Sequence, residues 1–183
     1  MIGLMDPDIA ATRNELVLHL FAGDAHQSFL DSVVDFPVAA INLRPPNVGY
    51  TFWQLVEHVR FCQYDMLDYL RNPAYREVVF PDDYWPEPQI LASEQQWVDT
   101  VAAFANDLKA VETFVQDAGT DLWVAAAHAW EPAHTPLRTV MVMIDHNAYH
   151  GGEMGILRQV MNLWPQSRID TFTVHAIDTQ NRL

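Results

Sequence analysis

The segment from about residue 137 to residue 163 constrains the fold most, because its helical pattern is apolar on nearly every side. At about 100° per residue, the segment divides into two stripes. One stripe carries Val142, Met143, His146, His150, Glu153, Leu157, Met161 and Trp164, and the other carries Val140, Ile144, Ala148, Gly151 and Gly155. A helix that is apolar all round is typical of a buried element. We therefore expect this segment to lie inside a helical core.

Three further stretches repeat apolar residues at helical spacing, namely residues 8–22, 51–71 and 93–118. Thr51 is the predicted N-cap of the second stretch, and Ser93 with Gln96 forms a predicted capping box for the third. A shorter helix is predicted from residue 24 or 25 to residue 35. Long helices joined by long connections favour an all-α fold, a four-helix bundle with crossover topology.

The remaining stretches are predicted as connections. Residues 36–50 and 73–92 hold several prolines and are expected to be loops, and the aromatic segment YWP at 84–86 indicates that the second loop folds over something. Residues 165–183 are expected to form a C-terminal arm, either a strand or an irregular segment. With 183 residues and no linker-like tract, the chain is expected to be a single domain over 1–183.

Charge and cysteine content exclude several classes of function. The chain has 10 basic and 24 acidic residues and a formal net charge of −14, which disfavours nucleic acids and anionic membranes as partners. The single Cys62 excludes an internal disulfide, and the N-terminal residues do not resemble a signal peptide. No apolar run approaches the roughly 18 residues of a membrane span. We therefore expect a soluble, cytoplasmic protein.

His146 and His150 are four residues apart in the most apolar helix, so their imidazoles lie on one helical face. A buried imidazole nitrogen without a partner costs about 1–3 kcal/mol, so both rings need hydrogen bonds or a metal ion. Spacing alone leaves both alternatives open.

His58 is a candidate third ligand. It lies on the flank of the apolar stripe of residues 51–71, about 100° from the centre of that stripe near Val59 and Leu70, and can face a neighbouring helix. With His146 and His150 it would supply three neutral nitrogens and leave coordination positions open for water or substrate. A structural histidine remains the alternative.

Three segments stand out in order along the chain: FWQLVEHVR (52–60), YWP (84–86) and DHNAYHGGE (145–153), together with AHQSF (25–29), RPPN (44–47) and TPLR (135–138). These segments resemble the DinB-like family of damage-inducible, YfiT-type metalloenzymes. The resemblance implies an up-up-down-down four-helix bundle, often dimeric, with a divalent metal ion held by His58, His146 and His150. Relatives often carry a histidine where this chain has Gln54, so Gln54 is not expected to be a ligand.

The same resemblance implies a metal-dependent enzyme, with zinc, nickel or a similar divalent ion. Such an ion would activate a thiol, as in S-transferases and isomerases, or water, as in hydrolases. The expected substrate is a small molecule, with a low-molecular-weight thiol as one candidate. The alternative is a non-catalytic, dimeric, stress-associated metal-binding protein. An apolar strip of Trp53, Phe61 and Tyr64 predicts the contact of a homodimer.

Glu153 is the candidate catalytic residue, because it follows His150 by about one helical turn in the same stripe. Besides a general base for water, it could be a fourth ligand or a hydrogen-bond acceptor for a ligand. A buried carboxylate paired with Arg60 or Arg158 is the structural alternative. No residue is expected to bind an organic cofactor.

Three other histidines, His26, His128 and His134, stand near loops that could cover the site. Histidines in loops are usually exposed polar groups, so each is a weaker candidate. Cys62 follows His58 by one turn and is expected to be a small buried hydrophobe and not a nucleophile.

Overall fold

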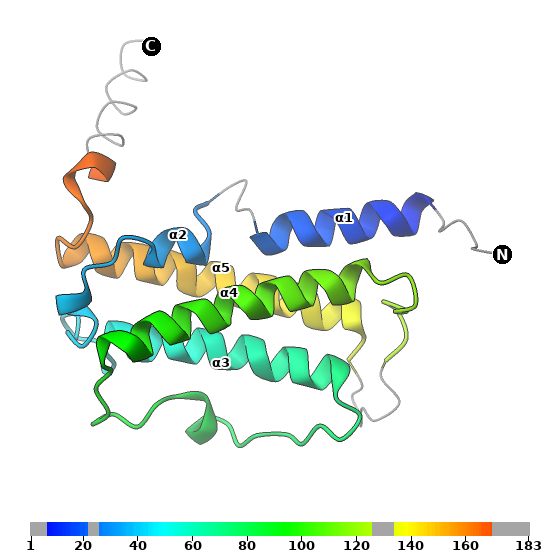
Figure 1. Cartoon of the computed structure of the whole chain (residues 1–183), viewed down its shortest axis with the longest axis horizontal. Helices are drawn as coiled ribbons and strands as arrows, with labels where there is room; N and C mark the ends of the chain where they lie inside the picture. Colours follow the sequence, from blue (N-terminus) through cyan, green and yellow to red (C-terminus); the bar gives the residue numbers. More distant parts are fainter. Residues whose placement is uncertain (1–6, 22–25, 126–133, 170–183) are drawn as a thin grey trace, which may run out of the picture.

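The computed structural model describes residues 7–21, 26–125 and 134–169, and within these ranges every regular element is a helix. The α-helices are α1 (Pro7–Phe21), α2 (Phe29–Val33), α3 (Phe52–Arg71), α4 (Glu94–Gln116) and α5 (Pro136–Val160), with short 3-10 turns η1 (Val38–Ala40) and η2 (Asp82–Tyr84) (Figure 1). The all-α fold class expected from the sequence is therefore confirmed. Within the same ranges, no helix combines the length and apolar character needed to cross a membrane.

Capping hydrogen bonds mark the first residues of α3 and α4. The Thr51 side chain accepts from Gln54 N while Gln54 Oε1 accepts from Thr51 N, and Ser93 and Gln96 repeat this arrangement at the start of α4. Both capping boxes satisfy backbone donors that a helix start leaves unpaired. The short helix α2 begins after its own cap, Ser28, so it is shorter than expected from the sequence.

Helices α3 and α4 run in the same direction, and α1 and α5 run opposite to them (Figure 1). Trp53 Nε1 donates to Thr100 Oγ1 near the starts of α3 and α4, and Gln63 Nε2 donates to Phe104 O further along both helices. This order differs from the expected up-up-down-down order. The parallel direction of α3 and α4 is possible because a long connection, residues 72–93, joins them. At about 3.3 Å per residue it can run back along the whole of α3, which is roughly 30 Å long.

Helix α5 is buried on its inner side only. Val140, Met143 and Met154 are fully buried against the other helices, whereas Tyr149 is 70% and Ile156 61% exposed. The prediction of a helix buried on all sides is wrong. Since α5 packs against α1, α2 and α3, one apolar face is left outside the bundle.

Arg158 fastens the C-terminal part of α5 to α2. Its guanidinium is completely buried, donates to the carbonyls of Ser32 and Val34, and pairs with Asp35 at 2.9 Å. The Trp164 ring lies 3.7 Å from the guanidinium carbon. A planar cation with several donors suits such a site, where carbonyls and an aromatic face surround the charge.

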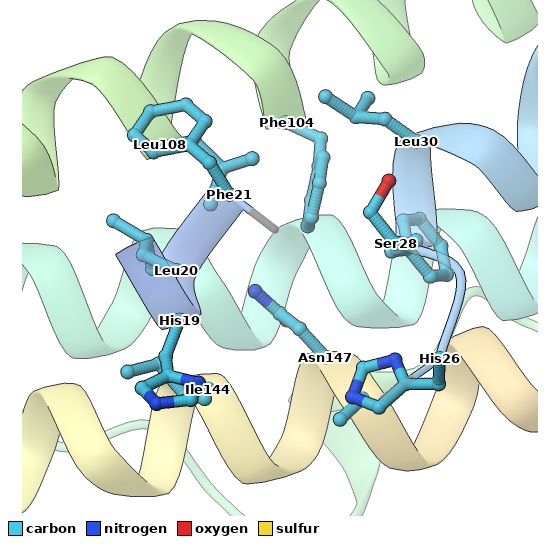
Figure 2. A pocket seen from close by; sticks show the side chains of 12 residues that line it. His19, Leu20, Phe21, His26, Ser28, Leu30, Phe104, Leu108, Ile144 and Asn147 are labelled. Atoms are coloured by element: carbon cyan, nitrogen blue, oxygen red, sulfur yellow. The ribbon is translucent and has the colours of Figure 1, made fainter. Parts of the chain in front are cut away.

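A small cavity lies where the end of α1 meets α2 and α5 (Figure 2). It measures about 30 Å³, room for about one water molecule. Asn147 lines it, and Asn147 Nδ2 donates to Gln63 Oε1 on α3 at 2.9 Å. The cavity is therefore a packing detail of the core and too small for a substrate.

Trp53 is 6% exposed and packs toward α4, so it cannot belong to an exposed dimer strip with Phe61 and Tyr64, and that prediction is wrong for Trp53.

Of the expected C-terminal arm, residues 166–169 form a helical turn. Residues 170–183 lie outside the described residues.

Candidate metal centre

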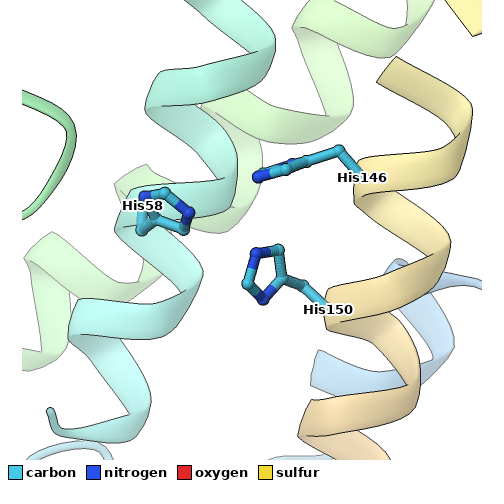
Figure 3. Close-up of side chains that lie close together, drawn as sticks. All are labelled: His58, His146 and His150. Carbon is cyan, nitrogen blue, oxygen red and sulfur yellow. The ribbon is translucent and has the colours of Figure 1, made fainter. Parts of the chain in front are cut away.

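His58 on α3 and His146 and His150 on α5 converge between the two helices (Figure 3). One potential ligand atom from each ring lies within 4.8 Å of the others. His58 and His150 are 6% and 8% exposed, and His146 is half-buried. The three imidazoles are thus close enough to bind one metal ion.

The loop of residues 72–93 orients His58. His58 Nδ1 lies 2.8 Å from the carbonyl oxygen of Tyr84, and the Trp85 ring stacks on the imidazole at 3.9 Å with an interplanar angle of 6°. Because a carbonyl can only accept, Nδ1 carries the proton and Nε2 keeps its lone pair. The aromatic loop expected to cover something therefore covers this histidine.

Glu153 orients His150 in a similar way. His150 Nδ1 donates to Glu153 Oε2 at 2.6 Å, and the Tyr50 hydroxyl donates to Glu153 Oε1. Burial alone would raise the pKa of the Glu153 carboxyl, but these two hydrogen bonds lower it below its usual range. Metal-binding histidines commonly have such a carboxylate partner on the second ring nitrogen.

His146 has a nitrogen that is not satisfied by the protein. Among the described residues, its buried Nδ1 makes no hydrogen bond. Burial, with smaller contributions from His150 and His58, lowers the pKa of His146 to about 4. Burial also lowers the pKa of His58. Neutral imidazoles are the form that binds divalent ions, so the donor set fits a late first-row metal such as zinc or nickel.

The arginine partners expected for Glu153 are engaged elsewhere. Arg60 pairs with Glu57 at 2.5 Å, and Arg158 pairs with Asp35. The pairing of Glu153 with either arginine is therefore wrong, and its neighbour in the helix, His150, is the partner instead.

Gln54 has a role that the sequence did not indicate. It is 1% exposed, and its Nε2 donates to the carbonyls of Glu87 and Ile90. Gln54 therefore anchors the loop that reaches His58. Cys62 is buried as expected, 3.6 Å from His58 Nδ1, and burial raises the pKa of its thiol to about 12, so it remains protonated.

The other candidate histidines lie apart from the cluster. His26 is exposed and lines the small cavity of Figure 2. His134 lines a larger cavity, where its backbone N–H donates to the Tyr69 hydroxyl at 3.2 Å. His128 lies outside the described residues. Tyr50, like Gln54, has a role that sequence reasoning missed, because nothing in the chain links it to a partner 103 positions away.

The chain matches a known protein family. A family model described as the DinB superfamily matches residues 23–154, which include His58, His146, His150 and Glu153. No curated protein and no solved structure matches the chain.

Proposed function

The chain belongs to the DinB superfamily, and from this membership we propose that it is a metal-dependent enzyme with His58, His146 and His150 as ligands. One observation carries the proposal: potential ligand atoms of three imidazoles, from two helices, lie within 4.8 Å of one another. A set of three nitrogens leaves coordination positions open, as catalytic sites require.

The surrounding residues would prepare the ligands. Tyr84 O accepts a hydrogen bond from His58 Nδ1, and Glu153 accepts one from His150 Nδ1, so both rings keep Nε2 free for an ion. A divalent ion bound there would lower the pKa of a thiol or water toward about 7. Trp85 covers the His58 ring and limits its access to bulk water.

Of the two chemistries, we propose thiol activation, as in an S-transferase or isomerase that uses a low-molecular-weight thiol. Hydrolysis needs a base that removes a proton from water, and both Glu153 oxygens already accept hydrogen bonds from Tyr50 and His150. A thiol, with an ordinary pKa near about 8.5, needs no such base once its pKa is lowered. Hydrolysis with Glu153 as catalytic base is the alternative.

Metal analysis of the purified protein tests the site. We expect one zinc or nickel ion per chain in the wild type and loss of that ion in His150→Ala. His26→Ala is the matched control, because His26 is exposed and lies apart from the cluster, and it should keep the ion. A wild type that stays metal-free after incubation with zinc and nickel would refute the proposal.

A second measurement separates an enzyme from a non-catalytic metal-binding protein. In the cobalt-substituted protein, a small thiol should change the visible spectrum, because an open site accepts a sulfur ligand. A closed structural site would not respond to thiol, and removal of its ion would unfold the chain.

A further inference from the structure

A cavity of about 350 Å³ lies between α3 and α5, on the side of the three-histidine cluster toward the start of α5. Asp65 lines it from α3 and Val142 from α5. Asp65 follows His58 by seven residues, about 10 Å along a helix, and Val142 precedes His146 by about one turn. The cavity therefore lies further along the same two helices from the candidate metal centre, and none of the three histidines lines it.

Tyr84 connects the cavity to the cluster. Its carbonyl oxygen accepts from His58, while its hydroxyl donates to Asp65 Oδ2 at 2.8 Å and its side chain lines the cavity. A ligand in the cavity would thus contact the same residue that orients a metal-binding histidine.

Aromatic rings form much of the wall. Tyr69, Tyr75 and Tyr84 line the cavity, and the rings of Tyr69 and Tyr75 meet nearly at a right angle, 87°, with centroids 5.3 Å apart. Two perpendicular rings present differently oriented surfaces to a ligand. Such aromatic walls bind ammonium groups through the negative faces of their π-systems.

The carboxylates of Asp65 and Glu77 line the cavity, and His134 is the one described lining residue that can carry a positive charge. Asp65 is 8% exposed and accepts from the hydroxyls of Tyr75 and Tyr84, and Glu77 lies at the same cavity. Among the described lining residues there is no lysine or arginine, and the structure shows no ion pair for Asp65. Burial raises the pKa of the Asp65 carboxyl, although both tyrosine hydroxyls oppose that shift. A buried carboxylate without a cation is costly unless a ligand supplies one.

We propose that this cavity binds a cationic amine, so that the substrate is a small molecule with a primary or quaternary ammonium group. The ammonium group packs against the tyrosine rings and faces Asp65. This inference names the substrate class for the proposed function. It rests on the proposed function for one point, that the reacting group of the substrate lies at the three histidines. The binding of the amine itself does not depend on a metal ion.

Titration calorimetry of the metal-free full chain tests the inference with choline as the probe. Its uncharged carbon analogue, 3,3-dimethyl-1-butanol, has nearly the same shape and no charge. We expect choline to bind at least about tenfold more tightly, since cation–π and carboxylate contacts depend on charge. Equal binding of the two compounds, or no binding of choline at millimolar concentrations, would overturn the proposal.

Variants locate the site. Asp65→Asn should weaken choline binding about tenfold, whereas Tyr75→Phe keeps the ring and should retain the preference for choline. Asp99→Asn, at an exposed aspartate on α4 outside the cavity lining, is the matched control and should bind choline as the wild type does. Equal affinity in Asp65→Asn and wild type would contradict the site. If Asp65→Asn does not fold, the comparison of choline with its uncharged analogue on the wild type still tests the proposal.

The result is independent of the metal experiment. A protein that prefers choline but binds no zinc or nickel would refute the proposed function and leave the amine site standing. A protein that binds the metal but does not prefer choline would refute the amine site alone.

Discussion

Glu153 accepts a hydrogen bond from His150 Nδ1 at 2.6 Å. This carboxylate, one turn along α5, therefore leaves Nε2 as the His150 nitrogen that can bind a metal ion. Such partners typically change metal affinity by 10–100-fold. We therefore expect Glu153→Gln to weaken zinc binding by about 10- to 100-fold, measured by competition with a chromophoric chelator.

Tyr50→Phe is a graded control for this prediction, because it removes only the hydroxyl that donates to Glu153. It should weaken zinc binding less than Glu153→Gln does. Unchanged zinc affinity together with a large loss of turnover in Glu153→Gln would instead identify Glu153 as a catalytic base.

Trp85 should report binding of the ion. Its ring is stacked on His58 at 3.9 Å, so a paramagnetic ion bound to His58 would lie close to the indole. Copper or cobalt should quench the tryptophan fluorescence of the wild type, and this quenching should be much smaller in Trp85→Phe. Quenching of the same size in wild type and Trp85→Phe would show that the ion binds elsewhere.

The site should hold its ion in mildly acidic solution. Burial lowers the pKa of His146 from 6.5 to about 4, and the pKa of His58 is also lowered. A lower pKa means that protons displace a metal ion from these rings only at lower pH. In equilibrium dialysis, zinc should remain bound at pH 6 and be released as the pH falls toward about 4. Half-release at pH 6.5 or above would contradict this, with folding checked by circular dichroism at each pH.

Arg158 and Arg168 both pair with Asp35, yet they should differ in their effect on stability. Arg158 is completely buried, and its removal leaves the carbonyls of Ser32 and Val34 without their donor, while Asp35 keeps only its pair with Arg168. Arg158→Ala should lower the free energy of unfolding by about 3–5 kcal/mol in urea denaturation. Arg168→Ala, at a partly exposed pair, should lower it by less than about 1 kcal/mol. Equal losses of unfolding free energy in the two variants would mean that the stabilisation comes only from the ion pairs with Asp35.

The parts of the fold that depend on neighbouring residues were predictable. Thr51 and Ser93 cap helices through contacts that span three residues, and His146 and His150 share a face because helical spacing puts them there. The family resemblance is confirmed by the family match. It placed His58 beside the pair, which spacing could not do.

The parts that depend on how helices pack were not predictable. The direction of α4 depends on the path of residues 72–93, and the exposed side of α5 depends on which neighbours surround it. The contact between Tyr50 and Glu153 joins residues 103 positions apart, and hydrophobic periodicity carries no information about such a pair.

The hydrogen bond from His58 to Tyr84 ends on a main-chain carbonyl, whereas the contact of Tyr84 with Asp65 uses its side chain. Every amino acid carries that carbonyl, so exchange of the residue at position 84 does not remove the acceptor for His58. A substitution at this position would therefore change the wall of the proposed amine cavity and leave the proposed metal centre with the acceptor that orients His58.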